Sequence, residues 1–260
     1  MSLGLVVCAT LGCKKDALPA WAELTAGASG DATVTGAPVA VPRLSAAPVL
    51  DGKQDDWTSG AILGPFVDPG NGGAAASGSP VAGRARVGWD EQNLYVAFVV
   101  HDRAPTSPFR RDDTDPHIWA QASGVEIMLQ PGDPGDNKDY FELQVDVAGA
   151  VFDSHFDDYN APITGTADGR TYGHQDFQSH AARAVFLADG AFYAIEIALP
   201  WSSLSAASAG RTTIPPRPGD VWRMNLYTFR DGQRQALAWS PLRGQGNFHR
   251  TSRFGRIRFE

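Results

Sequence analysis

Cysteine is scarce in this sequence and confined to its start. Of 260 residues, only Cys8 and Cys13 are cysteines, so the rest of the chain has neither a disulfide nor a thiolate metal ligand. Basic residues are also in the minority, because 22 Lys and Arg stand against 29 Asp and Glu and give a net charge of -7. Nucleic-acid binding needs a basic surface, so we expect no nucleic-acid partner.

Long apolar runs and common catalytic motifs are missing as well. No segment is long enough to cross a bilayer as a helix. The six histidines never recur at the His-x-x-x-His spacing of a helical zinc site, and neither a Gly-x-Ser-x-Gly elbow nor a phosphate-binding glycine loop is present. The 29 acidic residues could contain a catalytic carboxylate pair, but no pair stands out. We therefore expect a protein that is not an enzyme.

The first residues form a short apolar segment that ends in a cysteine. Residues 3–13 resemble the lipobox of a bacterial lipoprotein signal, with Cys13 as the lipidated residue. No Lys or Arg precedes the segment, and Thr10 stands where such signals usually have Leu. We expect residues 1–15 to be a signal remnant and the protein to be exported, either to the cell envelope or outside the cell. Contact with a membrane would occur only through a lipid on Cys13; an unmodified apolar N-terminus is the alternative.

The remaining chain has the composition and periodicity of a β protein. Residues 16–42 are mostly Ala, Gly, Thr, Pro and Val without periodicity, which predicts a flexible linker. Residues 43–260 are expected to form one domain. Apolar and polar residues alternate with period two in stretches such as 84–89 and 140–147, while residues 94–100 are almost entirely apolar. About ten strands and little helix predict an all-β, antiparallel, jelly-roll-like β-sandwich.

Landmarks along residues 48–260 occur in an order that resembles a known family. They are Asp51-Gly52 with Trp57, Trp89-Asp90, residues 93–98, Arg111-Asp112, Ile118-Trp119, Val125-Glu126-Ile127, Tyr140-Phe141-Glu142, residues 193–201, residues 219–225, Trp239-Ser240-Pro241 and Phe254-Gly255. This series resembles the family 9 carbohydrate-binding modules and their family 9-like relatives. The resemblance implies a β-sandwich that grips the reducing end of a glucan or xylan chain between two tryptophans and often carries calcium.

The same resemblance implies which residues form the binding site. Trp119 matches one clamp tryptophan, Glu126 matches the acidic residue on the following strand, and Trp239 is the candidate for the second clamp. Period-two alternation adds Gln144, Arg223 and Asn225 on polar strand faces that could line one groove. Carboxylate, amide and guanidinium groups bind sugar hydroxyls, and indole rings stack on the C–H faces of the sugar. As an alternative, Glu126, Glu196 and Arg223 would form an interior charge network that fixes strand pairing.

A turn rich in Pro and Gly gathers oxygen donors between two predicted strands. Its candidate ligands are Asp133, Asp136, Asn137 and Asp139. Ca²⁺ prefers oxygen ligands at this density, although the spacing does not match an EF-hand loop. We expect any calcium bound there to be structural, and we expect no other cofactor.

We therefore expect an exported bacterial domain that binds oligosaccharide or polysaccharide without catalysis, at the ends of β-glucan or xylan chains. Two alternatives remain open. A similar sandwich carries haem in some electron-transfer subunits, for which Met128, Met224 and His101 would be the candidate ligands. The domain could otherwise serve as a surface scaffold that binds another protein.

Overall fold

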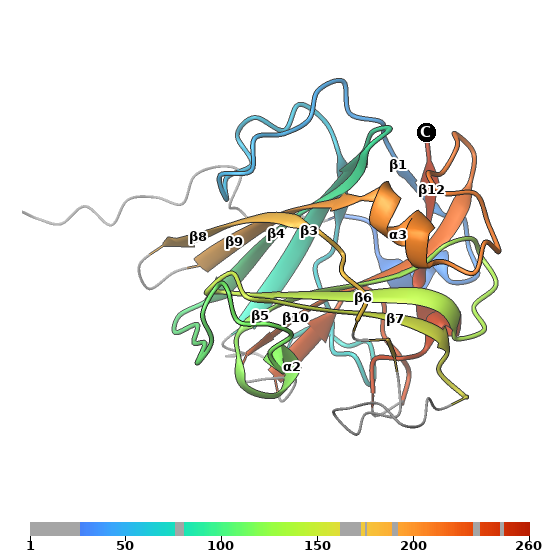
Figure 1. Ribbon diagram of the computed structural model, residues 1–260. Coiled ribbons are helices and arrows are strands. Elements are labelled where there is room, and N and C mark those ends of the chain that lie inside the picture. Colours follow the sequence, from blue (N-terminus) through green and yellow to red (C-terminus); the bar gives the residue numbers. More distant parts are fainter. Residues whose placement is uncertain are drawn as a thin grey trace, which may run out of the picture.

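The computed structural model contains two facing β-sheets, which confirms the predicted β-sandwich (Figure 1). It describes residues 27–75, 81–161, 173–174, 176–188, 192–230, 235–244 and 247–260. The predicted signal remnant with Cys13 lies outside the described residues. No helix within these ranges is long and apolar enough to cross a membrane.

The larger sheet has seven strands in the described part of the chain. Its order is β1 (Val39–Val41), β12 (Gly255–Phe259), β10 (Val221–Arg230), β5 (Gly124–Gln130), β6 (Lys138–Asp146) and β7 (Val151–Asp158), with β11 (Gln235–Ala238) also paired to β10. All of these pairs are antiparallel except β1 with β12, which is parallel.

Within the described ranges the smaller sheet has five antiparallel strands, and the helices are short. Its order is β2 (Ala61–Leu63), β3 (Val81–Trp89), β4 (Asn93–Asp102), β9 (Phe192–Pro200) and β8 (Ala182–Ala188). The helices are α1 (Gly30–Thr33), α2 (Ile118–Gln121), α3 (Trp201–Ala207) and the 3₁₀ turn η3 (Thr251–Arg253). Helix α3 directly follows Pro200, which ends β9.

The main core lies between the two sheets and follows from the period-two pattern. On β6, Phe141, Leu143 and Val145 face this core, whereas the residues between them face outward. At one end of the core, Trp89, Trp201, Trp222 and Phe259 pack edge to face, with ring centroids 5.2–6.0 Å apart. Edge-to-face contacts of this kind stabilise beyond the burial of area alone.

The outer face of the larger sheet is covered by chain segments and carries two smaller apolar clusters. Met128, Tyr227 and Phe248 belong to one cluster, and Ile118 and Phe152 belong to the other. Polar side chains of β5 and β6 lie on the same outer face. The polar side chains of β5 and β6 therefore lie on a sheet face that chain segments partly cover.

The domain begins earlier than the sequence indicates. The composition predicts a flexible linker over residues 16–42. Residues 16–26 lie outside the described residues, but residues 27–42 include α1 and β1 and pack on the sandwich. Asp31 makes ion pairs with Arg243 and Arg253, and the Thr33 hydroxyl accepts a 2.7 Å hydrogen bond from the backbone of Arg256. The small residues of this segment allow it to pack closely on the sandwich. A composition rich in small residues therefore does not indicate a flexible linker here.

Candidate functional site

Strand register brings the predicted site residues Glu126 and Gln144 together with two further polar side chains on the outer face of the larger sheet. Tyr227 of β10 pairs with Glu126 of β5, which pairs with Gln144 of β6. Glu142 lies two residues before Gln144 and so shares its face. All four side chains are buried. We call Glu126, Glu142 and Gln144 the polar row.

The Gln144 amide connects the polar row to the exposed surface. Its nitrogen donates to Glu142 Oε1 at 2.6 Å and to Glu126 Oε2 at 3.3 Å. Its oxygen accepts a 3.0 Å hydrogen bond from the backbone N–H of Trp119 in α2. Because one amide makes all three contacts, the position of α2 depends on the two carboxylates beneath it.

Trp119 is the only exposed tryptophan among those that the structure describes. Its exposed fraction is 38%, whereas Trp57, Trp89, Trp201, Trp222 and Trp239 are buried. The ring of His117, also exposed, stacks on the indole with centroids 5.4 Å apart and planes 25° apart. Two flat rings therefore lie at the surface beside the polar row. No sequence motif singled out His117; its position two residues before Trp119, at the start of the same turn, was the available signal.

Two tyrosines beside the polar row keep their protons. Burial raises the pKa of Tyr140, and the nearby Glu142 carboxylate adds to the effect. Burial and Glu126 likewise raise the pKa of Tyr227 well above its ordinary value. Both hydroxyls are therefore neutral donors at physiological pH. The Tyr140 hydroxyl lies 2.8 Å from His249 Nδ1.

Asn225 and Arg223 have structural partners and do not line an open groove. Asn225 is buried; its amide donates to Ser240 O at 2.9 Å and accepts from Ser240 N at 2.9 Å. Arg223 Nε lies 2.8 Å from Asp133 Oδ1 at the other end of β10. These contacts hold the segment after β11 and the turn before β6 against the sheet.

The predicted pairing of Trp119 with Trp239 is wrong. Trp239 is 1% exposed and packs in the main core. Its Nε1 donates to Ala28 O at 2.7 Å, and a Cβ at Gly30 would lie 2.9 Å from its ring. The segment expected to be a linker therefore covers the indole that was expected to bind sugar. No slot between two tryptophans is present in the described part of the chain.

The four candidate calcium ligands are engaged with different protein partners. Asp133 makes ion pairs with Arg223 and Arg256. Asp136 makes an ion pair with Arg211 at 2.6 Å, and the hydrogen bond from Arg211 lowers the pKa of the Asp136 carboxyl. Asn137 exchanges hydrogen bonds with the Thr251 backbone and hydroxyl, and Asp139 contacts His155 at 3.0 Å. Since cationic or donor side chains of the protein already occupy these oxygens, the four residues do not fit a calcium ion.

The proposed interior network of Glu126, Glu196 and Arg223 does not form either. Glu196 lies in β9 of the smaller sheet, far from the polar row. Its carboxylate accepts from Trp57 Nε1 at 2.8 Å and from the backbone of Gly52 and Asp51 at 2.9 and 3.1 Å. Burial raises the pKa of Glu196 to about 7, although these hydrogen bonds act in the opposite direction. Glu196 therefore anchors the loop that joins Asp51 to Trp57.

The geometry does not favour the haem alternative. Met128 lies in an apolar cluster on the outer face of the larger sheet, whereas Met224 lies in the core between the sheets. His101 belongs to β4 in the other sheet. Axial ligands must approach one iron from opposite sides, and these three side chains do not converge.

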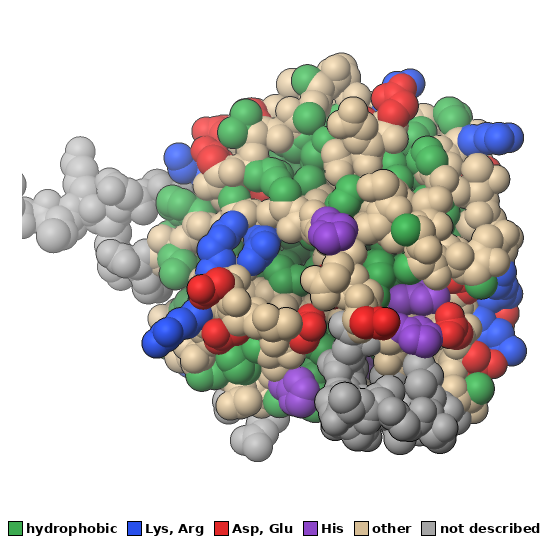
Figure 2. Space-filling model, viewed as in Figure 1, with side chains coloured by type: hydrophobic (Ala, Val, Ile, Leu, Met, Phe, Trp, Pro, Cys, Tyr) green, Lys and Arg blue, Asp and Glu red, His purple; other side chains and the backbone are tan. Residues whose placement is uncertain are grey.

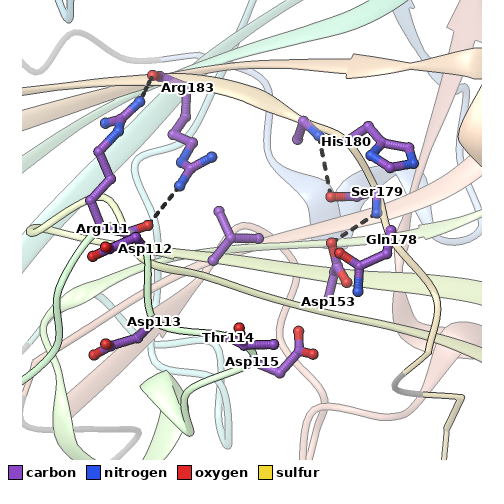
Figure 3. Close-up of a pocket in the computed structure, with 12 residues that line it drawn as sticks. Arg111, Asp112, Asp113, Thr114, Asp115, Asp153, Gln178, Ser179, His180 and Arg183 are labelled. Carbon is purple, nitrogen blue, oxygen red and sulfur yellow. Dashed lines mark hydrogen bonds between the residues drawn. The ribbon is translucent and has the colours of Figure 1, made fainter.

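A separate polar pocket of about 410 Å³ lies between β7 and β8 (Figure 3). Figure 3 shows Arg111 and Arg183 on one side of this pocket, with Asp115 and Asp153 on the other. Asp153 is buried, which raises its pKa, and one of its oxygens accepts from Ser179 N at 2.8 Å. Because its described lining includes no Trp, Tyr or Phe, this pocket offers a sugar no large stacking ring.

Comparisons with known proteins give a family match and fold neighbours. The sequence matches the family model described as carbohydrate family 9 binding domain-like over residues 50–260. No curated protein matches significantly. A putative carbohydrate-binding protein from Bacteroides uniformis is similar in structure, with TM-score 0.61 and 15% identity, covering 85% of this chain and 98% of that one.

Two solved complexes of a family 9 carbohydrate-binding module from Caldicellulosiruptor kristjanssonii are similar as well. The cellotriose complex has TM-score 0.55 and 16% identity, covering 85% of this chain and 93% of that one. The glucose complex has TM-score 0.53 and 15% identity, covering 85% and 95%. At these identities, the likeness shows a common fold.

Proposed function

Because this chain belongs to the carbohydrate family 9 binding-like domains, we propose that it is a non-catalytic module that binds the ends of β-glucan or xylan chains. Trp119 carries the proposal, since it is the one exposed indole among the described tryptophans. An indole face stacks on the C–H face of a pyranose ring. The solved relatives that were crystallised with glucose and cellotriose support a glucose-containing ligand.

The polar row supports this role because it fixes the position of Trp119, whose indole ring is the platform on which a sugar would stack. Gln144 ties the backbone of Trp119 to Glu126 and Glu142 through three hydrogen bonds. A platform held in one orientation loses less conformational entropy when a sugar binds. His117 stacks on one face of the indole, which restrains the indole ring and adds a ring nitrogen for a hydroxyl.

A chain end is the preferred ligand because it differs chemically from internal units. A terminal sugar has hydroxyls that internal units use in glycosidic bonds, and one stacking surface is enough to hold one terminal ring. The site therefore works with Trp119 alone, without a second tryptophan on the opposite side of the sugar.

Isothermal titration with glucose, cellobiose, xylobiose and cellotriose tests the proposal. We expect cellotriose to bind and its borohydride-reduced form, which lacks the closed terminal ring, to bind at least about tenfold more weakly, a difference of about 1.4 kcal/mol. Equal affinity for both forms would contradict recognition of the reducing end. Heat from none of the saccharides would contradict carbohydrate binding. Chromatography of cellotriose after long incubation should show no shorter products, in keeping with a non-catalytic module.

Export and lipid attachment at Cys13 are part of the proposal. The apolar residues before Cys13 and the extracellular polysaccharide ligand support them. Expression in a bacterium fed a labelled fatty acid should label the full chain, and Cys13→Ser should abolish the label. Equal labelling of both proteins would contradict lipidation at this cysteine.

A further inference from the structure

Two histidines and a carboxylate converge at the edge of the larger sheet, away from Trp119. His155 and Asp157 lie on β7, and a short antiparallel bridge places His174 beside them. Asp157 Oδ2 is 2.5 Å from His174 Nε2, and Asp157 Oδ1 is 3.6 Å from His155 Nδ1. One ligand atom from each of the three lies within 4.8 Å of the other two.

A second carboxylate orients the buried histidine. His155 is 3% exposed, its ring stacks on Phe141, and its Nε2 lies 3.0 Å from Asp139 Oδ1. Asp139 itself accepts from the Ser208 hydroxyl at 2.8 Å and from the Ala209 backbone at 3.0 Å. A neutral His155 that donates from Nε2 to Asp139 presents a lone pair at Nδ1. Proteins usually orient a metal-binding histidine with a carboxylate that accepts a hydrogen bond from the ring nitrogen that does not bind the metal.

With the proton of a neutral His155 on Nε2, the lone pair at Nδ1 faces Asp157. In that tautomer an imidazole lone pair and a carboxylate oxygen 3.6 Å apart are both acceptors, and a cation bound between them would be favoured by both. His174 Nε2 lies on the other oxygen of the same carboxylate. The three metal-ligand atoms, one each from His155, Asp157 and His174, therefore surround one point.

The space around this point is open to solvent on one side. A pocket of about 330 Å³ is lined by His155, Asp157, His174, Asp176, Phe177 and Ala207. Figure 2 shows histidine side chains next to acidic side chains on this face of the molecule. Asp176 or a water molecule could complete a fourth position. Contraction of each ligand atom toward the centre by about 1 Å or less would reach the zinc–ligand distances of about 2.0–2.2 Å.

We propose that His155, Asp157 and His174 bind a divalent transition metal, with zinc as the preferred ion. Imidazole nitrogen favours zinc, copper or nickel over calcium and magnesium, which prefer all-oxygen sites. The metal would join residues 173–174 and 176–177 to β7 and to the end of α3, and it would stabilise this edge of the sandwich.

Calorimetric titration of the chelator-treated protein with ZnCl₂, without saccharide, tests this site independently of carbohydrate binding. We expect one equivalent to bind and the melting temperature to rise. His174→Ala should weaken binding by more than about 100-fold, beyond the 10–100-fold loss typical of an outer-shell partner. Asp157→Asn, at a side chain that is 60% exposed, provides a second variant that should fold.

The matched control is His117→Ala, which removes an exposed histidine of another segment that is not part of the cluster and should leave zinc affinity unchanged. CaCl₂ in place of ZnCl₂ should give no binding that depends on His174. The proposal is overturned if zinc does not bind, or if His174→Ala and Asp157→Asn bind it as tightly as the unmodified protein. In either case the three residues form only a hydrogen-bonded chain.

Discussion

Gln144 holds Trp119 in place through a 3.0 Å hydrogen bond from the Trp119 backbone to its side-chain oxygen. The same side chain donates to Glu142 at 2.6 Å. The exposed indole and the buried carboxylates are therefore one connected unit. A change in the buried layer should alter the surface platform without touching the ligand.

Gln144→Met tests this connection, because methionine keeps the length of the side chain and removes its hydrogen bonds. We expect the free energy of unfolding to fall by about 1–3 kcal/mol, since the buried carboxylates lose the hydrogen bonds that Gln144 donates. Saccharide affinity should fall as well, because α2 is no longer fixed. Urea unfolding and titration with cellotriose measure the two effects. Unchanged affinity alongside the loss of stability would show that the polar row does not position Trp119.

Trp239 is expected to contribute to stability and not to sugar binding. Trp239→Ala should cost about 3–5 kcal/mol of unfolding free energy, as large core truncations do. The milder Trp239→Phe removes the hydrogen bond to Ala28 and should leave cellotriose affinity within about twofold, less than 0.5 kcal/mol. A tenfold loss of affinity in Trp239→Phe with normal stability would instead support a second clamp.

Residues 27–42 are expected to be part of the folding unit. A chain that starts at Arg43 lacks β1, the cover over Trp239 and the ion pairs of Asp31. We expect it to be less stable than a chain that starts at Gly27 by at least about 2 kcal/mol, from lost hydrogen bonds and apolar burial. Equal urea midpoints and slopes for the two chains would show that residues 27–42 are dispensable.

Glu196 should make stability fall as the pH rises from about 4.5 to 7. Its pKa is raised to about 7 in the folded state, against an ordinary value of 4.5, so within this window the folded protein keeps a proton that the unfolded chain releases. The unfolding free energy should therefore drop by up to about 3 kcal/mol across the window. Glu196→Gln should lose this dependence. A wild-type profile that matches the variant would contradict the raised pKa.

Much of the fold is visible in the sequence because strand periodicity is local. Apolar residues at alternate positions of β6 predict its buried face, and the continuous apolar run in β4 predicts a strand that is covered on both sides. The order of landmarks also predicts the family, which the match over residues 50–260 confirms. Trp119 and the polar positions beside it follow from the same motifs.

The errors come from contacts between residues that are distant in the sequence. Trp239 and Ala28 are 211 positions apart. Gly30 belongs to a stretch whose composition predicts a linker, but a small residue is required at this position because it lies against the indole. The acidic turn resembles a calcium loop because Arg211 and Arg256, its partners, lie 75 and 123 positions away. His155 and His174 do not have the spacing of a helical zinc site, because an antiparallel bridge brings them together.

The most direct test of carbohydrate binding through Trp119 is calorimetric titration of Trp119→Ala with cellotriose. The control is Leu187→Ala, which removes an exposed apolar side chain, 54% accessible, from β8 of the other sheet. We predict that Trp119→Ala loses about 2 kcal/mol of binding free energy, or about 30-fold in affinity, at unchanged melting temperature, while Leu187→Ala binds normally. Wild-type affinity in a folded Trp119→Ala protein would contradict the assignment of this indole as the binding platform.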